Sequence, residues 1–480
     1  PGASERGLAP GGGILRGASA PRHRDGGQAQ HEDAETHAHC DVLMISLYSP
    51  RMPSRQRWTV TAALTAAPRA PAPATSGRAA DGGRAADGPT LRTVARTGDA
   101  APGGGTFDRF GQETLPIVAP VNGRGEVAFF ARLIRGGADE GIFLQRGGRV
   151  VTVAREGDRV RGVGRLAGFG KHPTPALNDG GTVVFAAAVA EGRAVEGIFA
   201  WSAGRLRAVA TTGGAAPGMP GVLAGLDAPV VSARGDVVFM ATIRRGRESI
   251  EAILASRGGG LRKIVAQGDP APGGGSFAAF GPPALNNRGS VAFAAVVEGK
   301  GVPGGIFVVT GDRVKMVVGA GEETPIGGIF AKFSERIGLN DRGLIAFHSM
   351  LKFAPVEAAI FAAEDGKVRA VSRLGDAAPG GGTIVHFGLW PAVGSGREVA
   401  FAASIEGGAT PVAILLADGA QVTQVVAVGE TLPGGDRITT LSLYPVVSVG
   451  PRGHVTFAVA PTSTGDGPEG LFAAEPAGRR

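Results

Sequence analysis

One eight-residue motif recurs through most of this chain, and its recurrence limits the fold more than any other feature. All seven copies end in phenylalanine. The copies occupy residues 122–129, 178–185, 232–239, 286–293, 340–347, 394–401 and 450–457. Four begin with Asn and carry Gly at the fourth position, whereas the other three begin with Ser232, Gly394 and Gly450. A unit that recurs at a fixed interval predicts a repeat architecture.

A second marker gives the length of the repeat. A Gly-Asp-like pair, usually followed by Pro and a run of Gly, begins at Gly98, Gly157, Gly213, Gly268, Gly321, Gly375 and Gly429. Successive copies are 59, 56, 55, 53, 54 and 54 residues apart. The repeat is therefore about 55 residues long, and the chain holds seven units.

Each unit reads as β-structure throughout. In the fourth unit we expect strands at 262–266, 277–285, 291–297 and 305–310, with a turn at Asn286–Gly289. No segment keeps helical spacing over a dozen residues. Strands such as 127–131 are apolar at consecutive positions, which indicates burial on both faces, as in a blade between neighbouring blades. The unit is too long for a solenoid rung and suits a four-stranded blade.

The sequence thus predicts an all-β, seven-bladed β-propeller over residues 90–478. The last unit ends in a strand, residues 470–475, that lacks its hairpin partner, and residues 91–96 form a partner strand without a predecessor. Pairing of the two would close the ring and leave no open edge. We expect removal of residues 91–97 to be disproportionately destabilising.

Residues 1–89 differ in character from the repeats. They are built from Gly, Ala, Arg, Pro and Ser without a sustained period, which predicts a disordered tail. Residues 52–74 hold basic, apolar and Ala-x-Ala segments in the order of an export signal, with a plain low-complexity tail as the alternative. We interpret the metal-capable side chains at His31, His37, His39 and Cys40 as solvated tail rather than a metal site, because their spacing fits no common zinc motif.

The charge, the cysteine content and the apolar runs of the chain limit which binding partners and which covalent cross-links we expect. The formal charge is +7, but the basic residues are scattered and lack interleaved aromatic rings, so we expect no nucleic-acid partner. The chain has one cysteine, which excludes an intrachain disulfide. Because no run approaches eighteen apolar residues, we expect no transmembrane segment. We also expect a monomer.

The repeats resemble the bacterial tandem-repeat family described by the pattern NxxGxxAF. The resemblance covers residues 91–478, and the turns beginning at Asn122, Asn178, Asn286 and Asn340 match the pattern, with three departures elsewhere. It implies a propeller-like fold and an exported or surface location. It implies no catalytic residue. Because the chain ends in Gly478-Arg479-Arg480, an apolar C-terminal anchor is not expected.

The acidic member of the Gly-Asp pair is the strongest candidate for a ligand site. Six units carry it, and the residues are Asp99, Asp158, Asp269, Glu322, Asp376 and Glu430. If these carboxylates face the central channel, they form a ring that could hold a cation, calcium being the ion considered, or attract a basic ligand. The alternative, which we favour, is that each accepts backbone hydrogen bonds within its own loop.

The repeated Asn residues are interpreted as turn formers that tolerate positive φ, rather than as ligand-binding amides. The histidines of the domain occupy non-equivalent repeat positions, and no nucleophile elbow or phosphate-binding motif is present. The sequence therefore predicts no catalytic residue and no cofactor.

These patterns predict a non-enzymatic, exported or cell-surface binding module that presents a loop-rich face to a protein or a glycan. Two alternatives stay open. One is an extracellular polysaccharide hydrolase or lyase that uses the Gly-Asp carboxylates as acid and base. The other is a propeller stabilised by a bound cation. The predicted location is extracellular, periplasmic or at the cell surface.

Overall fold

The computed structural model describes residues 89–111, 117–170, 173–441, 447–460 and 469–475. The chain divides into two units, Pro1–Trp58 and Thr59–Arg480, and every described residue belongs to the second. The predictions for the tail, including the export signal at 52–74 and the His/Cys cluster, lie outside the described residues.

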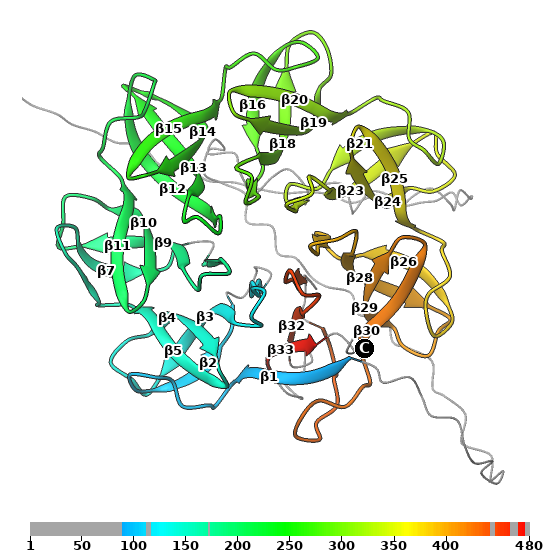
Figure 1. Cartoon of the computed structure of the whole chain (residues 1–480), viewed down its shortest axis with the longest axis horizontal. Coiled ribbons are helices and arrows are strands. Elements are labelled where there is room, and N and C mark those ends of the chain that lie inside the picture. Colours follow the sequence, from blue (N-terminus) through cyan, green and yellow to red (C-terminus); the bar gives the residue numbers. More distant parts are fainter. Residues whose placement is uncertain (1–88, 112–116, 171–172, 442–446, 461–468, 476–480) are drawn as a thin grey trace, which may run out of the picture. The chain divides into compact units, whose positions relative to one another are not determined.

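The second unit is a seven-bladed propeller, as predicted. Its described residues contain 33 strands and no helix. The strands form seven sheets arranged around a ring, with the chain passing from one sheet to the next in order (Figure 1). Nothing in the described part of the chain forms a helix long and apolar enough to cross a bilayer.

The blades share one strand order, and each position is occupied by equivalent strands. The first position holds β2 (Thr106–Arg109), β7 (Gly164–Gly168), β12 (Val222–Val231), β16 (Ser276–Phe280), β21 (Ile329–Phe333) and β26 (Thr383–Phe387). Five short strands each pair with the second strand of their blade. They are β8 (Ala176–Leu177), β17 (Ala284–Leu285), β22 (Gly338–Leu339), β27 (Ala392–Val393) and β31 (Ser448–Val449). The hairpin of β6 (Arg159–Val160) with β7 is specific to the second blade.

The remaining three positions are regular. The second position holds β3 (Val127–Ile134), β9 (Val183–Ala190), β13 (Val237–Arg245), β18 (Val291–Glu298), β23 (Ile345–Lys352), β28 (Val399–Glu406) and β32 (Val455–Val459). The third holds β4 (Glu140–Arg146), β10 (Glu196–Ser202), β14 (Glu248–Arg257), β19 (Gly304–Thr310), β24 (Ala358–Glu364), β29 (Val412–Asp418) and β33 (Gly470–Glu475). The fourth holds β5 (Arg149–Arg155), β11 (Arg205–Thr211), β15 (Gly260–Ala266), β20 (Arg313–Gly319), β25 (Lys367–Arg373), β30 (Gln421–Ala427) and β1 (Thr90–Arg96).

The expected strand at 277–285 is instead two strands, β16 and β17. Pro282 and Pro283 lie between them, and proline cannot donate a hydrogen bond to the sheet. The other strands expected in the fourth unit fall within two residues of their observed bounds.

Strand β1 closes the ring. It pairs antiparallel with β33, with Thr90 opposite Glu475 and Arg96 opposite Gly470. The seventh blade is thus built from both ends of the propeller, and β1 runs along the outer edge of the ring in Figure 1. The predicted closure is confirmed by this pairing, which places the first and the last strand of the propeller in the sheet of the seventh blade.

The motif phenylalanines form the core between blades. All seven are at most 3% exposed: Phe129, Phe185, Phe239, Phe293, Phe347, Phe401 and Phe457. Phe293 contacts three rings of its own blade and packs in one cluster with Val238 and Ile253 of the preceding blade. Burying each ring contributes roughly 1.5–3 kcal/mol. This repeated packing gives the blades a common orientation, so that their polar turns meet.

Candidate ligand-binding site at the two ends of the blades

The antiparallel strands give every blade two ends. We call the end that carries the seven motif turns the turn end; its turns comprise residues 122–125, 178–181, 232–235, 286–289, 340–343, 394–397 and 450–453. The opposite end, where each second strand stops and the Gly-Asp loop begins, is the loop end. The turns gather around the centre of the ring in Figure 1. Residues at equivalent turn positions are therefore neighbours.

The Asn side chain organises its own turn through hydrogen bonds rather than through positive φ. Asn286 is 4% exposed, and its Oδ1 accepts from the backbone N–H of Arg288 at 3.1 Å and of Ser290 at 2.9 Å. Gly289, not Asn286, adopts the left-handed conformation, with φ of 83°. The interpretation of the Asn residues as turn formers is correct in outcome. The physical reason given for it is wrong.

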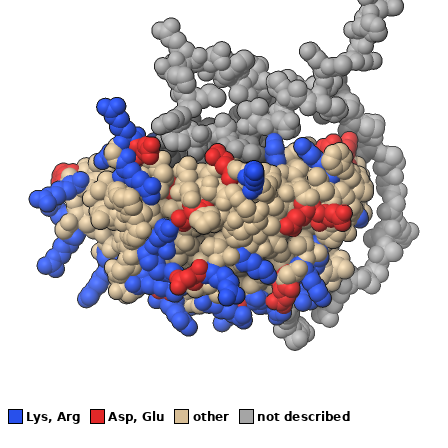
Figure 2. Space-filling view, turned by 90° about the horizontal axis from the view of Figure 1, so that it is seen from above, with Lys and Arg blue, Asp and Glu red and all other residues tan. Residues whose placement is uncertain are grey.

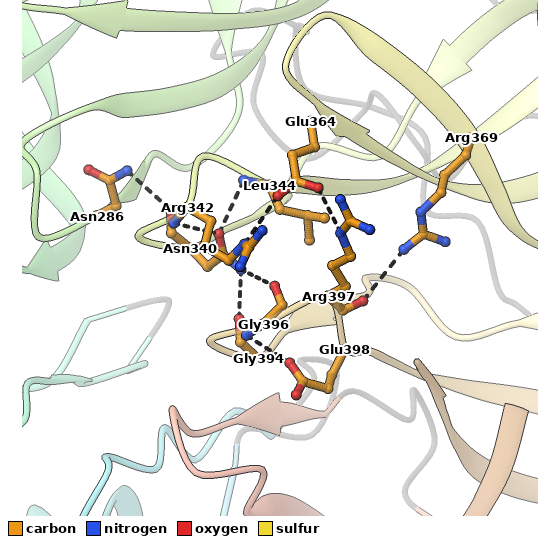
Figure 3. Close-up of polar contacts among 10 residues, drawn as sticks. All are labelled: Asn286, Asn340, Arg342, Leu344, Glu364, Arg369, Gly394, Gly396, Arg397 and Glu398. Carbon is orange, nitrogen blue, oxygen red and sulfur yellow. Dashed lines mark hydrogen bonds and ion pairs between the residues drawn. The ribbon is translucent and has the colours of Figure 1, made fainter. Parts of the chain in front are cut away.

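The same amide also joins neighbouring blades. Asn286 Nδ2 donates to the carbonyl oxygen of Asn340 at 3.1 Å, and Asn340 Nδ2 donates to those of Gly394 and Gly396 at 2.8 and 2.9 Å (Figure 3). Asn122 and Asn178 make equivalent bonds to the next turns at 3.0 and 2.8 Å. Each buried amide thus has its acceptor satisfied within its own turn and its donor satisfied across the blade boundary.

Turns that lack the first Asn use other atoms for the same contact. Asn287 Oδ1 accepts from the backbone N–H of Ala233 at 2.5 Å, and Ser395 Oγ donates to the carbonyl of Pro451 at 2.6 Å. At the seventh boundary, Thr456 Oγ1 donates to the carbonyl of Ala119 at 2.5 Å. The turn end is therefore connected by hydrogen bonds at every blade boundary.

Arginine occupies six of the seven turns, a feature that the sequence interpretation missed by treating basic residues as scattered. We call these six residues the arginine arc: Arg124, Arg234, Arg288, Arg342, Arg397 and Arg452. All six are exposed. The turn of the second blade has Gly180 instead, and Nη2 of Arg124 extends to within 2.8 Å of the position that a Cβ on the adjacent Gly181 would take. The arc therefore reaches toward the one blade that contributes no arginine.

Few carboxylates neutralise the arginine arc, and those that do are shared. Glu364 accepts from Arg342 Nε at 3.2 Å and from Arg397 Nε at 3.0 Å, so that two blades converge on one carboxylate (Figure 3). Glu126 likewise lies 2.8 Å from Arg124 Nη2 and 3.4 Å from Arg146 Nε. Each carboxylate thus offsets one of two positive charges.

The other half of the arc has no such partner. Among the described residues, Arg234, Arg288 and Arg452 make no ion pair. The turns themselves hold two carboxylates, Asp179 and Asp341, and both accept backbone N–H bonds from the preceding turn, at 2.7 Å each. The seven turns, with six Arg and two Asp, therefore carry net positive charge. Figure 2, an edge-on view of the ring, shows many Lys and Arg side chains over the described surface, with Asp and Glu side chains among them.

The loop end holds the six carboxylates that the sequence singled out. Four of them accept from the backbone N–H three residues earlier, each at 2.8 Å, and these are Asp99, Asp158, Asp269 and Asp376. Glu430 accepts from Gln424 Nε2 at 2.7 Å. Glu322 Oε1 lies beside Gly319, at 3.3 Å from where a Cβ of that glycine would lie. These contacts match the own-loop alternative, and ligand binding by the six stays a prediction.

A different set of glutamates joins the blades at the loop end. Four of them accept a backbone N–H of the next blade: Glu140 from Phe169, Glu196 from Leu226, Glu251 from Phe280 and Glu469 from Phe110. Three stand at or just before the start of a third strand, and Glu251 is the fourth residue of β14. The distances range from 2.7 to 3.4 Å. The recurring Glu before Gly-Ile-Phe or Gly-Leu-Phe was a signal in the sequence that could have revealed three of them, whereas Glu251 precedes Ala-Ile-Leu.

These glutamates are charged groups in partly desolvated positions. Burial raises the pKa of Glu140, Glu251 and Glu469 above the ordinary glutamate value, and the backbone N–H bond offsets part of that effect. A raised pKa means that the charged form is less favourable in the folded protein than in water. The loop end therefore uses carboxylates for inter-blade bonding at an electrostatic cost that the Asn amides avoid.

The remaining titratable groups form no further site. Burial lowers the pKa of His348 to about 4, so that this imidazole is neutral beside Phe387, 5.9 Å away between ring centres. Within the described ranges, no group of three or more His, Cys, Asp or Glu side chains is placed to hold a metal ion.

The fold and the two sets of inter-blade bonds define this protein as a seven-bladed repeat propeller whose turn end is basic. The chain belongs to a family of unknown function (DUF7453), whose model matches residues 73–304 and 294–479. That match supports the propeller repeat but does not test the resemblance to the NxxGxxAF pattern. Among curated proteins no sequence match was found.

Several solved structures share part of the architecture. An oligogalacturonate lyase in complex with manganese is 12% identical, with 81% of this chain and 98% of that chain covered and a TM-score of 0.46. An oligogalacturonate lyase from Vibrio parahaemolyticus is 11% identical, with 81% and 97% covered and a TM-score of 0.42. A GH74 xyloglucanase from Xanthomonas campestris is 13% identical, with 81% and 54% covered and a TM-score of 0.42. Likeness at this level carries no argument about function.

Proposed function

We propose that the protein is a non-enzymatic binding propeller, exported or displayed at the cell surface, that presents its turn end to a protein or glycan ligand. The observation that carries this proposal is that most of the candidate carboxylates at the loop end accept hydrogen bonds within their own loops. Four of the six candidates are bound within their own loops, each in a different blade. A glycosidase instead needs two carboxyl groups about 5 to 9.5 Å apart on either side of a substrate.

The rigidity of the turn end also supports a binding function. Its backbone carbonyls and amides are joined from blade to blade, so the exposed side chains stand on a rigid base. Rigid, preorganised surfaces lose little conformational entropy on binding. All six turn arginines are exposed, and three of them, Arg234, Arg288 and Arg452, make no ion pair among the described residues. The resemblance to exported NxxGxxAF proteins is consistent with a ligand outside the cytoplasm.

The test is a binding screen combined with a turnover assay. The full chain is immobilised and exposed to an array of neutral and charged glycans and peptides, and each bound ligand is then incubated with the protein while its chain length is followed. We expect binding without shortening of the ligand. Ligand cleavage that disappears in Asp158→Asn or Asp269→Asn would contradict the proposal and favour the hydrolase or lyase alternative.

Two further measurements address the remaining parts of the proposal. Mass spectrometry of the N-terminus of the native protein should show cleavage within or after residues 52–74, and a mature protein that keeps this segment would contradict export by this route. The melting temperature should not rise with added calcium, because a cation that binds only the folded state would raise it.

A further inference from the structure

The arginine arc is the largest set of equivalent charged residues that the fold leaves exposed, and it identifies a ligand class. Successive turns touch through hydrogen bonds of 2.8 to 3.1 Å, so the arginines of adjacent turns belong to neighbouring segments. Five of them hold the third position of their turn, and Arg397 holds the fourth. The result is a set of guanidinium groups contributed by the turns of six blades at one end of the propeller. A ligand that matches it must carry several negative charges along its length.

We propose that the arginine arc binds a linear anionic polysaccharide, one whose repeating sugars carry carboxylate or sulfate groups. This inference rests on the proposed binding function and names its ligand. Guanidinium presents planar, paired N–H donors that match the two oxygens of a carboxylate or sulfate. The unpartnered Arg234, Arg288 and Arg452 can offer these donors without first breaking an ion pair within the described structure.

The composition of the turns argues against the other polyanions. The seven turns contain Asn, Gly, Arg, Asp, Ser, Ala and Pro, and no aromatic or large aliphatic side chain. Single-stranded nucleic acids bind chiefly by stacking bases on aromatic rings, which the turns lack. Protein partners are anchored by aromatic or large apolar residues in central pockets, which the turns also lack. A hydrated polysaccharide chain needs neither.

The paired arginines also fit a multivalent anion. Glu364 is shared by Arg342 and Arg397, and Glu126 by Arg124 and Arg146, so each pair keeps about one uncompensated positive charge. Asp179 and Asp341 each accept a backbone N–H bond from the preceding turn, and both side chains are exposed. Positive charge therefore extends around most of the arc.

The experiment compares two triple variants with the same change in charge. The first, Arg234→Ala with Arg288→Ala and Arg452→Ala, removes the unpartnered half of the arc. The matched control, Arg135→Ala with Arg193→Ala and Arg247→Ala, removes three exposed arginines from the loop-end connections between second and third strands. Both variants lose three positive charges. They differ only in the end of the blades from which the charges are lost.

Binding of the full chain is measured by fluorescence anisotropy with end-labelled oligomers of alginate, dextran sulfate and neutral dextran. We expect the natural sequence to bind alginate, dextran sulfate or both, with an affinity that falls as salt is added, and to ignore neutral dextran. The turn-end variant should lose about tenfold in affinity, and the control less than about twofold. The oligomer that binds more tightly identifies the acidic group.

A third variant separates charge from geometry. Replacing the same three arginines with lysine keeps the charge but removes the paired N–H donors, so its affinity should fall between those of the natural sequence and the alanine variant. Circular dichroism melts of all variants show whether a loss of binding reflects a loss of folding.

Several outcomes would overturn the proposal. They are equal losses in the two alanine variants, equal binding of neutral dextran, equally tight binding of single-stranded DNA of matched charge, or no binding of either anionic oligomer. In the last case, capture of a neutral glycan or a peptide at the turn end would leave the proposed binding function standing. Shortening of a bound oligomer would instead contradict the non-enzymatic function itself.

Discussion

The two ends of the blades solve the same problem with opposite chemistry. At the turn end, neutral Asn amides donate to carbonyl oxygens of the next blade, as Asn340 does to Gly394 and Gly396. At the loop end, Glu carboxylates accept backbone N–H bonds from the next blade, as Glu140 does from Phe169. A buried amide carries no charge to desolvate, whereas a buried carboxylate does. The inter-blade bond at the loop end therefore costs desolvation energy that the neutral amide bond at the turn end does not.

The largest expected effect on stability comes from replacing a neutral amide at the turn end with a carboxylate. Asn340→Asp keeps the oxygen that accepts from Arg342 and Leu344 but replaces the donor with a second oxygen facing two carbonyls. Asn340 is 7% exposed, so the charge would be nearly buried and unpaired. We expect a loss of about 3–5 kcal/mol in the free energy of unfolding, measured by chemical denaturation.

Asn340→Ala is the control for that exchange. It removes the donor and the acceptor together without adding a charge, and we expect a loss of about 2–3 kcal/mol. Asn340→Ser should cost less than the alanine variant, because Ser232 Oγ already accepts the equivalent bond from Asp236 N–H at 3.2 Å in the third blade. If Asp and Ala were equally tolerated, the neutral character of the turn-end bond would have no importance.

The opposite exchange at the loop end should have a smaller effect. Glu140→Gln keeps the Oε1 acceptor for Phe169 N–H, 2.7 Å away, and removes a charge that burial disfavours. At neutral pH we expect no loss of stability, and a gain of up to about 1 kcal/mol. Glu140→Ala leaves that N–H without its acceptor and should cost about 1 kcal/mol. A Gln variant less stable than the Ala variant would show that the charge itself stabilises the boundary.

The blade pattern was predictable from sequence because it depends on residues repeated in every unit. Phenylalanines such as Phe293 set the packing, and glycines such as Gly289 set the turn. Both signals are local. The number of blades followed from counting the repeats, and the pairing of β1 with β33 followed from the unpaired strand at each end of the repeats.

The candidate site was less predictable because its geometry joins residues more than fifty positions apart. Asn340 meets Gly394, and Glu364 meets Arg397, only once two blades are side by side. The Gly-Asp carboxylates drew attention because they repeat, but a repeated Asp inside a turn satisfies its own loop first. The arginines repeat equally well. They were overlooked because each stands alone in its segment of sequence.

The pH dependence of stability sharpens the contrast between the two ends. Burial raises the folded-state pKa of Glu140, Glu251 and Glu469 above the value in the unfolded chain. The folded state then holds protons that the unfolded state has lost, so the contribution of these groups is present below the ordinary glutamate pKa of about 4.5 and disappears as pH rises through the raised values.

The triple variant Glu140→Gln, Glu251→Gln and Glu469→Gln isolates this contribution. Its melting temperature should match that of the natural sequence below about pH 4 and exceed it by about 1–3 °C at neutral pH. Melts by differential scanning fluorimetry across this range measure the difference. A difference that is constant with pH would mean that these carboxylates titrate alike in the folded and unfolded states.

The smallest effect on stability is expected for the three turn-end arginines that we propose bind the ligand. Arg234, Arg288 and Arg452 are exposed, and the described structure gives them no ion-pair partner, so replacing all three with alanine should change the free energy of unfolding by less than about 0.5 kcal/mol. Chemical denaturation measures this directly, with Arg342→Ala, which loses its contact with Glu364, as the paired reference. A propeller that keeps its stability but loses anion binding would separate the exposed charges from the amides beneath them. A triple variant that unfolds readily would show instead that the arginines belong to the fold, and the turn end would then resemble the loop end, with its charges committed to holding the blades together.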